Sequence, residues 1–173
     1  YGTTPLISFS NRHYLKTIVK LDRNADSAYA SLKSFGYTSH CASCGVRSSS
    51  KFPQSICGCS ASPSPLDYAG PLWLGELHDP DFIKKCIEIN QKRDYEDKFE
   101  IEVMLAQLKS EIGLPSYYYN IHNLSKLKKT LFTPKIQDVV DRLTASGFIA
   151  VKTHFSPISI KTNAPYFELL KVI

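Results

Sequence analysis

The sequence lacks the patterns that would place it in a membrane or give it a self-contained active site. It has no run of eighteen apolar residues, so no membrane-spanning helix is expected. Its eight glycines are dispersed and form no Gly-x-Gly-x-x-Gly or other phosphate-binding loop. It contains neither a Gly-x-Ser-x-Gly nor a His-Glu-x-x-His motif, and its five histidines are scattered. These absences exclude the enzyme classes that depend on such motifs, and no catalytic or cofactor-binding residue is expected.

The N-terminus also lacks features. Tyr1-Gly2-Thr3-Thr4-Pro5 has neither an initiator methionine nor the charged and apolar regions of a signal peptide. We therefore expect a fragment or processed piece of a cytoplasmic protein. The 173 residues are 43% hydrophobic and 21% charged, which is typical of a folded chain with one sizeable core or two small subdomains.

Excess positive charge is confined to the last third of the chain. Residues 1–121 contain 13 Lys and Arg and 13 Asp and Glu, whereas residues 122–173 contain 8 and 3, which gives the net charge of +5. A neutral body with a basic end indicates a surface that faces a polyanion, although a solvated charged face also explains so small an excess. The candidate nucleic-acid-binding residues are Lys126, Lys128, Lys129, Lys135, Arg142, Lys152, His154 and Lys161. Each lysine or arginine neutralises a phosphate without reading sequence, so the hypothesis depends on the cluster.

Four of the five cysteines form two close pairs. Cys41-Ala-Ser-Cys44-Gly45 and Cys57-Gly58-Cys59 are twelve residues apart, like the two knuckles of a zinc ribbon. Four thiolates bind Zn²⁺ tetrahedrally and leave no open position, so we expect a structural zinc site made by Cys41, Cys44, Cys57 and Cys59. The second pair is Cys-x-Cys, which leaves disulfides, buried thiols and another metal as alternatives, with His40 as a substitute for a weak ligand.

The first half of the chain predicts a β-α-β unit. Residues 6–20 are rich in β-branched and aromatic side chains and favour extended structure. Asn24 is placed to cap a helix that runs to about Phe35 and stops at Gly36, after which Tyr37 begins a strand. The cysteines lie in a ribbon-like insertion at about residues 38–68. We therefore expect one subdomain over residues 1–78.

The second half predicts mainly helices. Two helices are expected over residues 79–93 and 99–112. A short helix follows the strand at 117–119, and a last helix runs from Thr133 and Pro134 to Gly147. Cys86 falls on the apolar side of the first of these helices and is expected in the core. Residues 148–153 and 166–170 are strand-like, and a loop that contains Pro157, Lys161 and Pro165 is expected between them. This order is that of a winged helix, a module that binds DNA or RNA or serves as a protein-interaction scaffold. The expected fold class is α+β, with a helical, winged-helix-like subdomain over residues 79–173.

A glycine- and proline-rich stretch joins the two halves. Residues 70–80 hold the only tryptophan, Trp73, and end with Asp79 and Pro80, a favourable N-cap and first helical residue. We expect a tight connection that buries Trp73 between the two parts.

Several segments together resemble the tRNA guanine-N2 dimethyltransferase family. The stretch Gly70-Pro-Leu-Trp-Leu-Gly-Glu-Leu-His-Asp79 resembles the family's Gly-Pro-Leu/Met-Trp…His-Asp motif. Ser10-Asn-Arg-His-Tyr14 resembles its Ser-x-Asp-His-Tyr strand, and Tyr117-Tyr-Tyr-Asn-Ile-His122 its Tyr-Tyr-Tyr-Asp-Leu-His segment. Thr153-His-Phe-Ser-Pro157 and Ile160-Lys-Thr-Asn-Ala-Pro165 resemble its C-terminal tail. The cysteine pairs lie where archaeal-type members place theirs, and the departures are Asn11, Glu76, Asn120 and the Cys-x-Cys pair.

The resemblance covers the whole chain but only the C-terminal half of such an enzyme. It implies that an N-terminal domain, absent here, binds S-adenosylmethionine and transfers methyl groups to guanine N2 in tRNA. This chain would bind and place the tRNA, hold zinc, and be inactive alone. Its expected partners are tRNA and that domain, with no membrane. The alternative is a stand-alone zinc-ribbon and winged-helix nucleic-acid-binding module without enzymatic activity.

Overall fold

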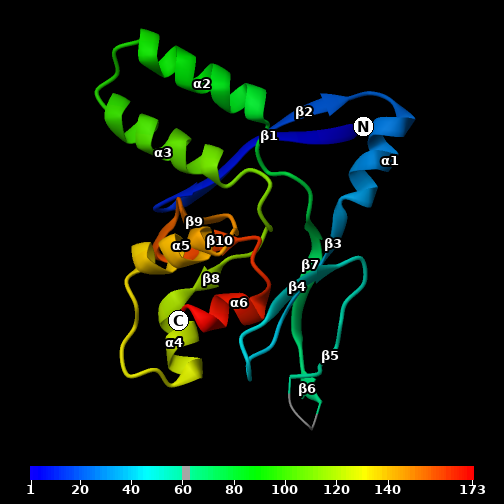
Figure 1. Cartoon of the computed structure of the whole chain (residues 1–173). Coiled ribbons are helices and arrows are strands. Elements are labelled where there is room, and N and C mark those ends of the chain that lie inside the picture. Colours follow the sequence, from blue (N-terminus) through cyan, green and yellow to red (C-terminus); the bar gives the residue numbers. More distant parts are fainter. Residues whose placement is uncertain (60–62) are drawn as a thin grey trace.

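The computed structural model describes residues 1–59 and 63–173 and combines helices and strands in an α+β fold, as expected (Figure 1). Four small antiparallel sheets are distributed along the chain, and six helices lie between and beside them in these described ranges. Within the same ranges, no helix combines the length and apolar character needed to cross a bilayer.

A β-hairpin and a capped helix open the chain. The elements are β1 (Gly2–Asn11), β2 (Tyr14–Asp22) and α1 (Ala25–Lys33). The Asn24 side chain accepts a 2.7 Å hydrogen bond from the Ser27 N–H, which confirms the predicted cap. The predicted stop at Gly36 is wrong, because α1 ends at Lys33 and Gly36 lies inside the next strand. A Cβ at Gly36 would meet the Ser50 carbonyl at 2.6 Å, so close strand packing explains this glycine.

The cysteines lie at one end of a three-stranded sheet. Its strands are β3 (Phe35–His40), β4 (Arg47–Ser50) and β7 (Asp67–Trp73), in the order β4-β3-β7. A two-residue pairing of β5 (Ile56–Cys57) with β6 (Ser64–Pro65) extends from it. Figure 1 shows this sheet beside the C-terminal helices. Trp73 ends β7 half-buried, with its ring edge-on to Phe35 at 5.6 Å and its indole N–H bonded to the Glu76 carbonyl.

Two long helices pack on the hairpin. They are α2 (Pro80–Lys92) and α3 (Lys98–Ser110), which lie side by side in Figure 1. Asp79 caps α2 by accepting a 2.7 Å hydrogen bond from the Phe82 N–H, as predicted. Ile7 of β1 shares a core with Ile83, Leu105 and Leu108, and Cys86 packs against that core as expected. This core includes residues from both sides of the predicted boundary at residues 78 and 79.

The C-terminal part has its own core. Its elements are β8 (Tyr119–Asn120), α4 (Ile121–Lys128), α5 (Ile136–Ala145), β9 (Ala150–Thr153), β10 (Ser156–Thr162) and α6 (Tyr166–Lys171). The strands form a sheet in the order β8-β10-β9, and α4 to α6 bury apolar side chains against it.

Two predictions for this part are wrong. Residues 166–170 form a helix, because Pro165 begins it and the helical spacing turns both Tyr166 and Leu169 toward the core. The helix predicted to start at Thr133 and Pro134 instead begins at Ile136, after Lys135 in an extended conformation.

Candidate functional site: a four-cysteine cluster and a buried charge network

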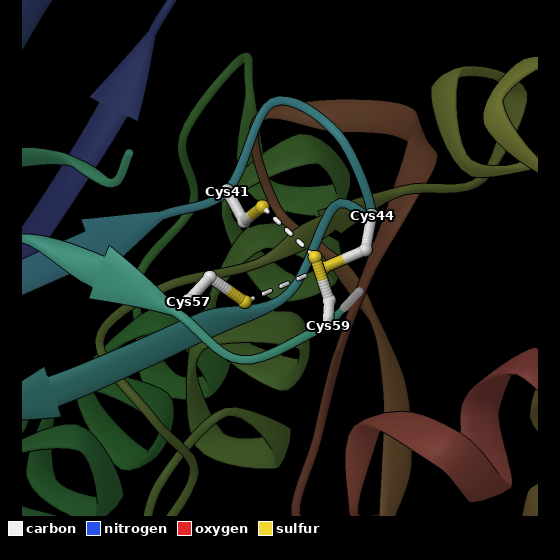
Figure 2. A group of neighbouring side chains, drawn as sticks. All are labelled: Cys41, Cys44, Cys57 and Cys59. Carbon is white, nitrogen blue, oxygen red and sulfur yellow. Dashed lines mark hydrogen bonds between the residues drawn. The ribbon is translucent and has the colours of Figure 1, made fainter. Parts of the chain in front are cut away.

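The sulfur atoms of Cys41, Cys44, Cys57 and Cys59 converge on one point (Figure 2). All four lie within 4.8 Å of one another, with Sγ–Sγ distances of 3.8 Å for Cys41 and Cys59 and 3.9 Å for Cys44 and Cys57. Cys41 and Cys44 lie in the turn between β3 and β4, Cys57 ends β5, and Cys59 follows it. The structure thus brings the two predicted knuckles together, and His40 is not part of this group of described residues.

The first knuckle folds through its backbone. The Cys41 N–H donates to the Val46 carbonyl at 3.0 Å, and the Gly45 N–H donates to the Cys41 carbonyl at 2.7 Å. Gly45 has φ of +87°, a conformation that favours glycine. A Cβ there would lie 2.9 Å from both Leu124 Cδ2 and the Tyr166 hydroxyl, so Gly45 also permits close packing on the C-terminal part.

The geometry of the cluster fits a tetrahedral zinc ion. A Zn–S bond of about 2.3 Å gives sulfur–sulfur distances of about 3.8 Å in a regular tetrahedron. Burial, together with hydrogen bonding to the other three sulfurs, raises the pKa of the Cys44 thiol to about 12. Burial also opposes ionisation of Cys41, but hydrogen bonds from Cys44 and its backbone lower that pKa to about 7. A divalent cation stabilises four neighbouring thiolates that otherwise disfavour one another's ionisation.

Tyrosines connect the cluster to the C-terminal part. The Tyr166 hydroxyl donates a hydrogen bond to the Cys44 carbonyl, and the Tyr166 ring stacks on Tyr119 at 5.7 Å. Burial, together with the four nearby thiols, raises the pKa of Tyr166 to about 12, so it remains a donor at neutral pH. Tyr119 therefore supports the knuckle through its stacking on Tyr166.

The predicted basic residues divide into six with exposed side chains and two with buried side chains. Lys126, Lys128, Lys129, Lys135, Arg142 and Lys152 are exposed on α4, α5, β9 and the adjoining turns. The Lys128 ammonium group donates to the Leu170 carbonyl at 2.7 Å, and the Arg142 guanidinium donates to the Val172 carbonyl at 3.4 Å. These two side chains stabilise the C-terminal end of the chain.

Lys161 and His154 make structural contacts in place of the predicted nucleic-acid contacts. The side chains of Lys161, His154 and Glu111 are 5%, 7% and 0% exposed. Glu111 Oε2 lies 2.9 Å from Lys161 Nζ, and Glu111 Oε1 lies 2.8 Å from His154 Nδ1 and accepts from the His154 N–H. The pairing with one buried carboxylate explains why both residues lie inside the protein.

Glu111 is a residue that sequence reasoning missed. Burial alone would raise the pKa of its carboxyl group, but His154 and Lys161 lower it to about 2. The network extends to β1, where the Ser10 N–H donates to His154 Nε2 at 3.1 Å and the Ser8 N–H to His78 Nδ1 at 3.5 Å. A single glutamate at a helix end gives no sequence signal. The motifs that carry His78, His154 and Lys161 gave the available hint.

The fold and the site together define an α+β protein with a ribbon-like four-cysteine cluster and a basic C-terminal part. The family model of N2,N2-dimethylguanosine tRNA methyltransferase matches residues 1–173, so the chain belongs to this family.

Relatives and a solved structure agree with the family. The chain is 33% identical over 169 residues to the tRNA (guanine(26)-N(2))-dimethyltransferase of Methanobrevibacter smithii, covering 96% of this chain and 43% of that enzyme. It is 30% identical over 172 residues to that of Pyrococcus abyssi, covering 99% and 43%. The structure of Trm1 from Pyrococcus horikoshii in complex with S-adenosyl-L-methionine superimposes with a TM-score of 0.83 at 25% identity, covering 99% of this chain and 44% of that one. The chain thus spans less than half the length of the relatives it matches.

Proposed function

We propose that this chain is the C-terminal, tRNA-positioning part of an S-adenosylmethionine-dependent tRNA guanine-N2 dimethyltransferase that works in the cytoplasm. The single observation that carries the proposal is the family match over the entire chain, combined with coverage of only 43–44% of the similar enzymes. S-adenosylmethionine, bound by an N-terminal domain, supplies an electrophilic methyl group for the exocyclic amine of guanine. The residues described here bind the tRNA backbone and hold it in place.

A winged-helix-like module over the C-terminal part belongs to this proposal. The order α3, β8, α4, α5, β9, β10 and the sheet order β8-β10-β9 support it. In such a module α5 would lie nearest the RNA, and the turn between β9 and β10 would form the wing. Lys126, Lys129, Lys135 and Lys152 are the basic side chains on these elements proposed to contact phosphates.

The division into subdomains over residues 1–78 and 79–173 also remains a proposal. Because Ile7 shares its core with α2 and α3, the division describes the order of elements along the chain, and neither piece is expected to fold alone.

A structural zinc ion at Cys41, Cys44, Cys57 and Cys59 completes the proposal. The convergence of four sulfurs at distances that suit tetrahedral zinc supports it. Reduced thiols of this kind belong to a reducing compartment. Metal analysis of the purified chain should find about one zinc per molecule, and Cys57→Ser should lower that content. Occupancy by iron, or no metal after purification under reducing conditions, would count against it.

Methylation and binding assays test the main proposal. The 173-residue chain should bind an unmodified tRNA transcript with an affinity that falls as salt increases, and the triple variant Lys129→Ala, Lys135→Ala, Lys152→Ala should bind more weakly with a smaller salt slope. With S-adenosylmethionine present it should form no N2,N2-dimethylguanosine, and its formation would overturn the proposal. The stand-alone binding module is the second candidate, favoured by the basic module and cysteine cluster. The gene sequence preceding Tyr1 decides between the two.

A further inference from the structure

A groove separates the cysteine-bearing sheet from the C-terminal part. Two adjoining hollows of about 480 and 350 Å³ share His40 and Arg47 in their linings. We call the combined feature the Arg47 groove, and its defining residues are His40, Arg47, Tyr68, Trp73, Tyr118 and Lys126. They come from β3, β4, β7, the segment before β8, and α4, so the groove exists only when these elements are assembled.

One end of the groove is aromatic. Tyr68 and Trp73, on β7, face Tyr117 and Tyr118 of the opposite wall across the larger hollow. Tyr68 is 55% exposed, and Trp73 and Tyr118 are half-buried, so ring surface is available to a ligand. Each nucleobase has a flat π-face that stacks on such rings.

The middle and the other end are cationic. The Arg47 guanidinium carbon lies 5.2 Å from the centroid of the Tyr118 ring, which holds this long side chain across the groove. The exposed Lys126 lines the smaller hollow. Among the described lining residues Asp67 is the only acidic one. A planar guanidinium suits a phosphate, and the charge balance favours an anionic ligand.

The walls of the groove are fixed relative to each other. The Tyr166 hydroxyl bonds the Cys44 carbonyl, and the Gly45 backbone packs against Leu124 and Leu127 beneath the smaller hollow. The cysteine cluster on one wall and α4 on the other thus hold Arg47 and Lys126 in a fixed arrangement.

We propose that the Arg47 groove binds an unpaired segment of an RNA strand, with bases stacked at the Tyr68 and Trp73 end and phosphates at Arg47 and Lys126. This inference rests on the proposed function, since it names where and how a tRNA contacts the chain. Paired RNA presents its bases edge-on inside the helix, so only an unpaired segment can place base faces on these rings. The excess of basic over acidic lining groups favours RNA over a peptide as the occupant.

The single tryptophan gives a direct test. Titration of the 173-residue chain with an unmodified tRNA transcript should quench Trp73 fluorescence, and a single-stranded oligonucleotide should compete while a duplex of the same length should not. Arg47→Ala and Tyr68→Ala should each weaken tRNA binding about tenfold. Tyr68 is exposed, so its removal leaves the fold intact and keeps the test valid should Arg47→Ala misfold. Lys84→Ala, an exposed lysine on α2 away from the groove, is the matched control and should change nothing.

The outcomes separate this inference from the broader proposal. Salt-dependent tRNA binding without Trp73 quenching, and unchanged by either groove variant, would overturn the groove while leaving the proposed function standing. Equal competition by duplex and single strand would overturn the unpaired-strand assignment. Absence of any tRNA binding at low salt would overturn both the groove inference and the proposed tRNA-positioning function.

Discussion

Glu111 keeps its negative charge inside the protein because its neighbours supply what water would otherwise supply. Its carboxylate faces the Lys161 ammonium and the His154 ring, and it accepts from the His154 N–H. His78 lies close to the same groups but stays neutral. Burial and the nearby Lys161 lower its pKa to about 4, although the Glu111 carboxylate acts to raise it. Its Nε2 is buried without a hydrogen-bond partner among the described residues. The shifted pKa values of Glu111 and His78 therefore make the stability of the folded protein depend on pH.

The first prediction concerns this pH dependence. The pKa of His78 falls from 6.5 in the unfolded chain to about 4 in the folded protein, so below pH 6.5 the unfolded state binds a proton that the folded state does not. Stability should therefore fall by on the order of 3 kcal/mol between pH 6.5 and about 4. The Glu111 contribution, with a folded pKa of about 2, is lost only as the pH falls from about 4.5 toward 2.

Urea unfolding at pH 7.5, 6.0 and 5.0 would measure the effect. His78→Gln keeps an acceptor for the Ser8 N–H but cannot titrate, so its stability should vary less over this range than that of the wild type. Parallel curves for the two proteins would show that His78 is not the titrating group.

A second residue-scale prediction uses two glycines with similar backbones. Gly45 and Gly113 have φ of +87° and +78°, but a Cβ at Gly45 would clash with Leu124 and Tyr166, whereas Gly113 has no described atom within 4 Å of that position. Gly113→Ala should cost about 1 kcal/mol, from backbone conformation alone. Gly45→Ala should cost about 2–4 kcal/mol, since it adds overpacking. Thermal or urea unfolding compares the two, and equal losses would mean that the knuckle adjusts to the extra methyl group.

At the scale of elements, two of the three helix starts predicted from capping residues are confirmed, and the one at Thr133 is wrong. Asn24 and Asp79 both accept the hydrogen bonds predicted for them, because a short polar side chain before a helix acts through its own neighbours. Local pattern failed at α6, where aromatic and aliphatic residues favour a strand but Pro165 and the core select a helix. It failed again at Gly36, whose role is set by the approach of Ser50 from another strand.

In the candidate site, too, features set by neighbouring residues were predictable and features set by distant residues were not. The spacing of the cysteines was sufficient to predict that four sulfurs meet, because knuckle geometry is local. The fates of Lys161 and His154 depended on Glu111, which is 50 residues from the first and 43 from the second in sequence. Nothing in the basic composition of the last third separates a lysine that pairs with a buried carboxylate from one that faces solvent. The Arg47 groove was equally hidden, since its walls come from distant parts of the chain.

The helix caps supply an element-scale prediction with a control inside the molecule. Asp79 precedes α2 and accepts a hydrogen bond from the Phe82 N–H, whereas Asp97 precedes α3 and makes no side-chain capping bond in the described structure. Asp79→Ala should therefore reduce the free energy of unfolding by about 1 kcal/mol, and Asp97→Ala by only a few tenths. Urea unfolding curves measured side by side test the difference. A larger loss for Asp97→Ala would show that the helix dipole matters more than the capping bond.

At the scale of the whole molecule, two cores are joined by polar contacts. One core lies between β1, α2 and α3, and the other lies among β8 to β10 and α4 to α6. Glu111, at the end of α3, contacts Lys161 of β10 and the residue after β9, and His154 in turn accepts from β1. The Tyr166 bond to the Cys44 carbonyl joins the cysteine-bearing sheet to the second core. A tRNA-positioning role would require these parts to hold a fixed arrangement, and these contacts are the polar links that join them.

The last prediction tests the joining contact by a double-mutant cycle. Lys161→Met should destabilise the chain by about 3–5 kcal/mol, because it removes the ammonium group that neutralises a buried carboxylate. Glu111→Gln removes the charge but keeps an acceptor for the His154 N–H, so the double variant should lose less stability than the two single losses added together. Urea unfolding followed by both Trp73 fluorescence and far-ultraviolet circular dichroism gives each corner of the cycle. The two probes should coincide in the wild type and separate in Lys161→Met, since Trp73 reports on the sheet and most of the helical signal comes from elsewhere. Additive losses with coincident probes throughout would mean that Glu111 and Lys161 contribute independently and that packing of the two cores alone holds the molecule together.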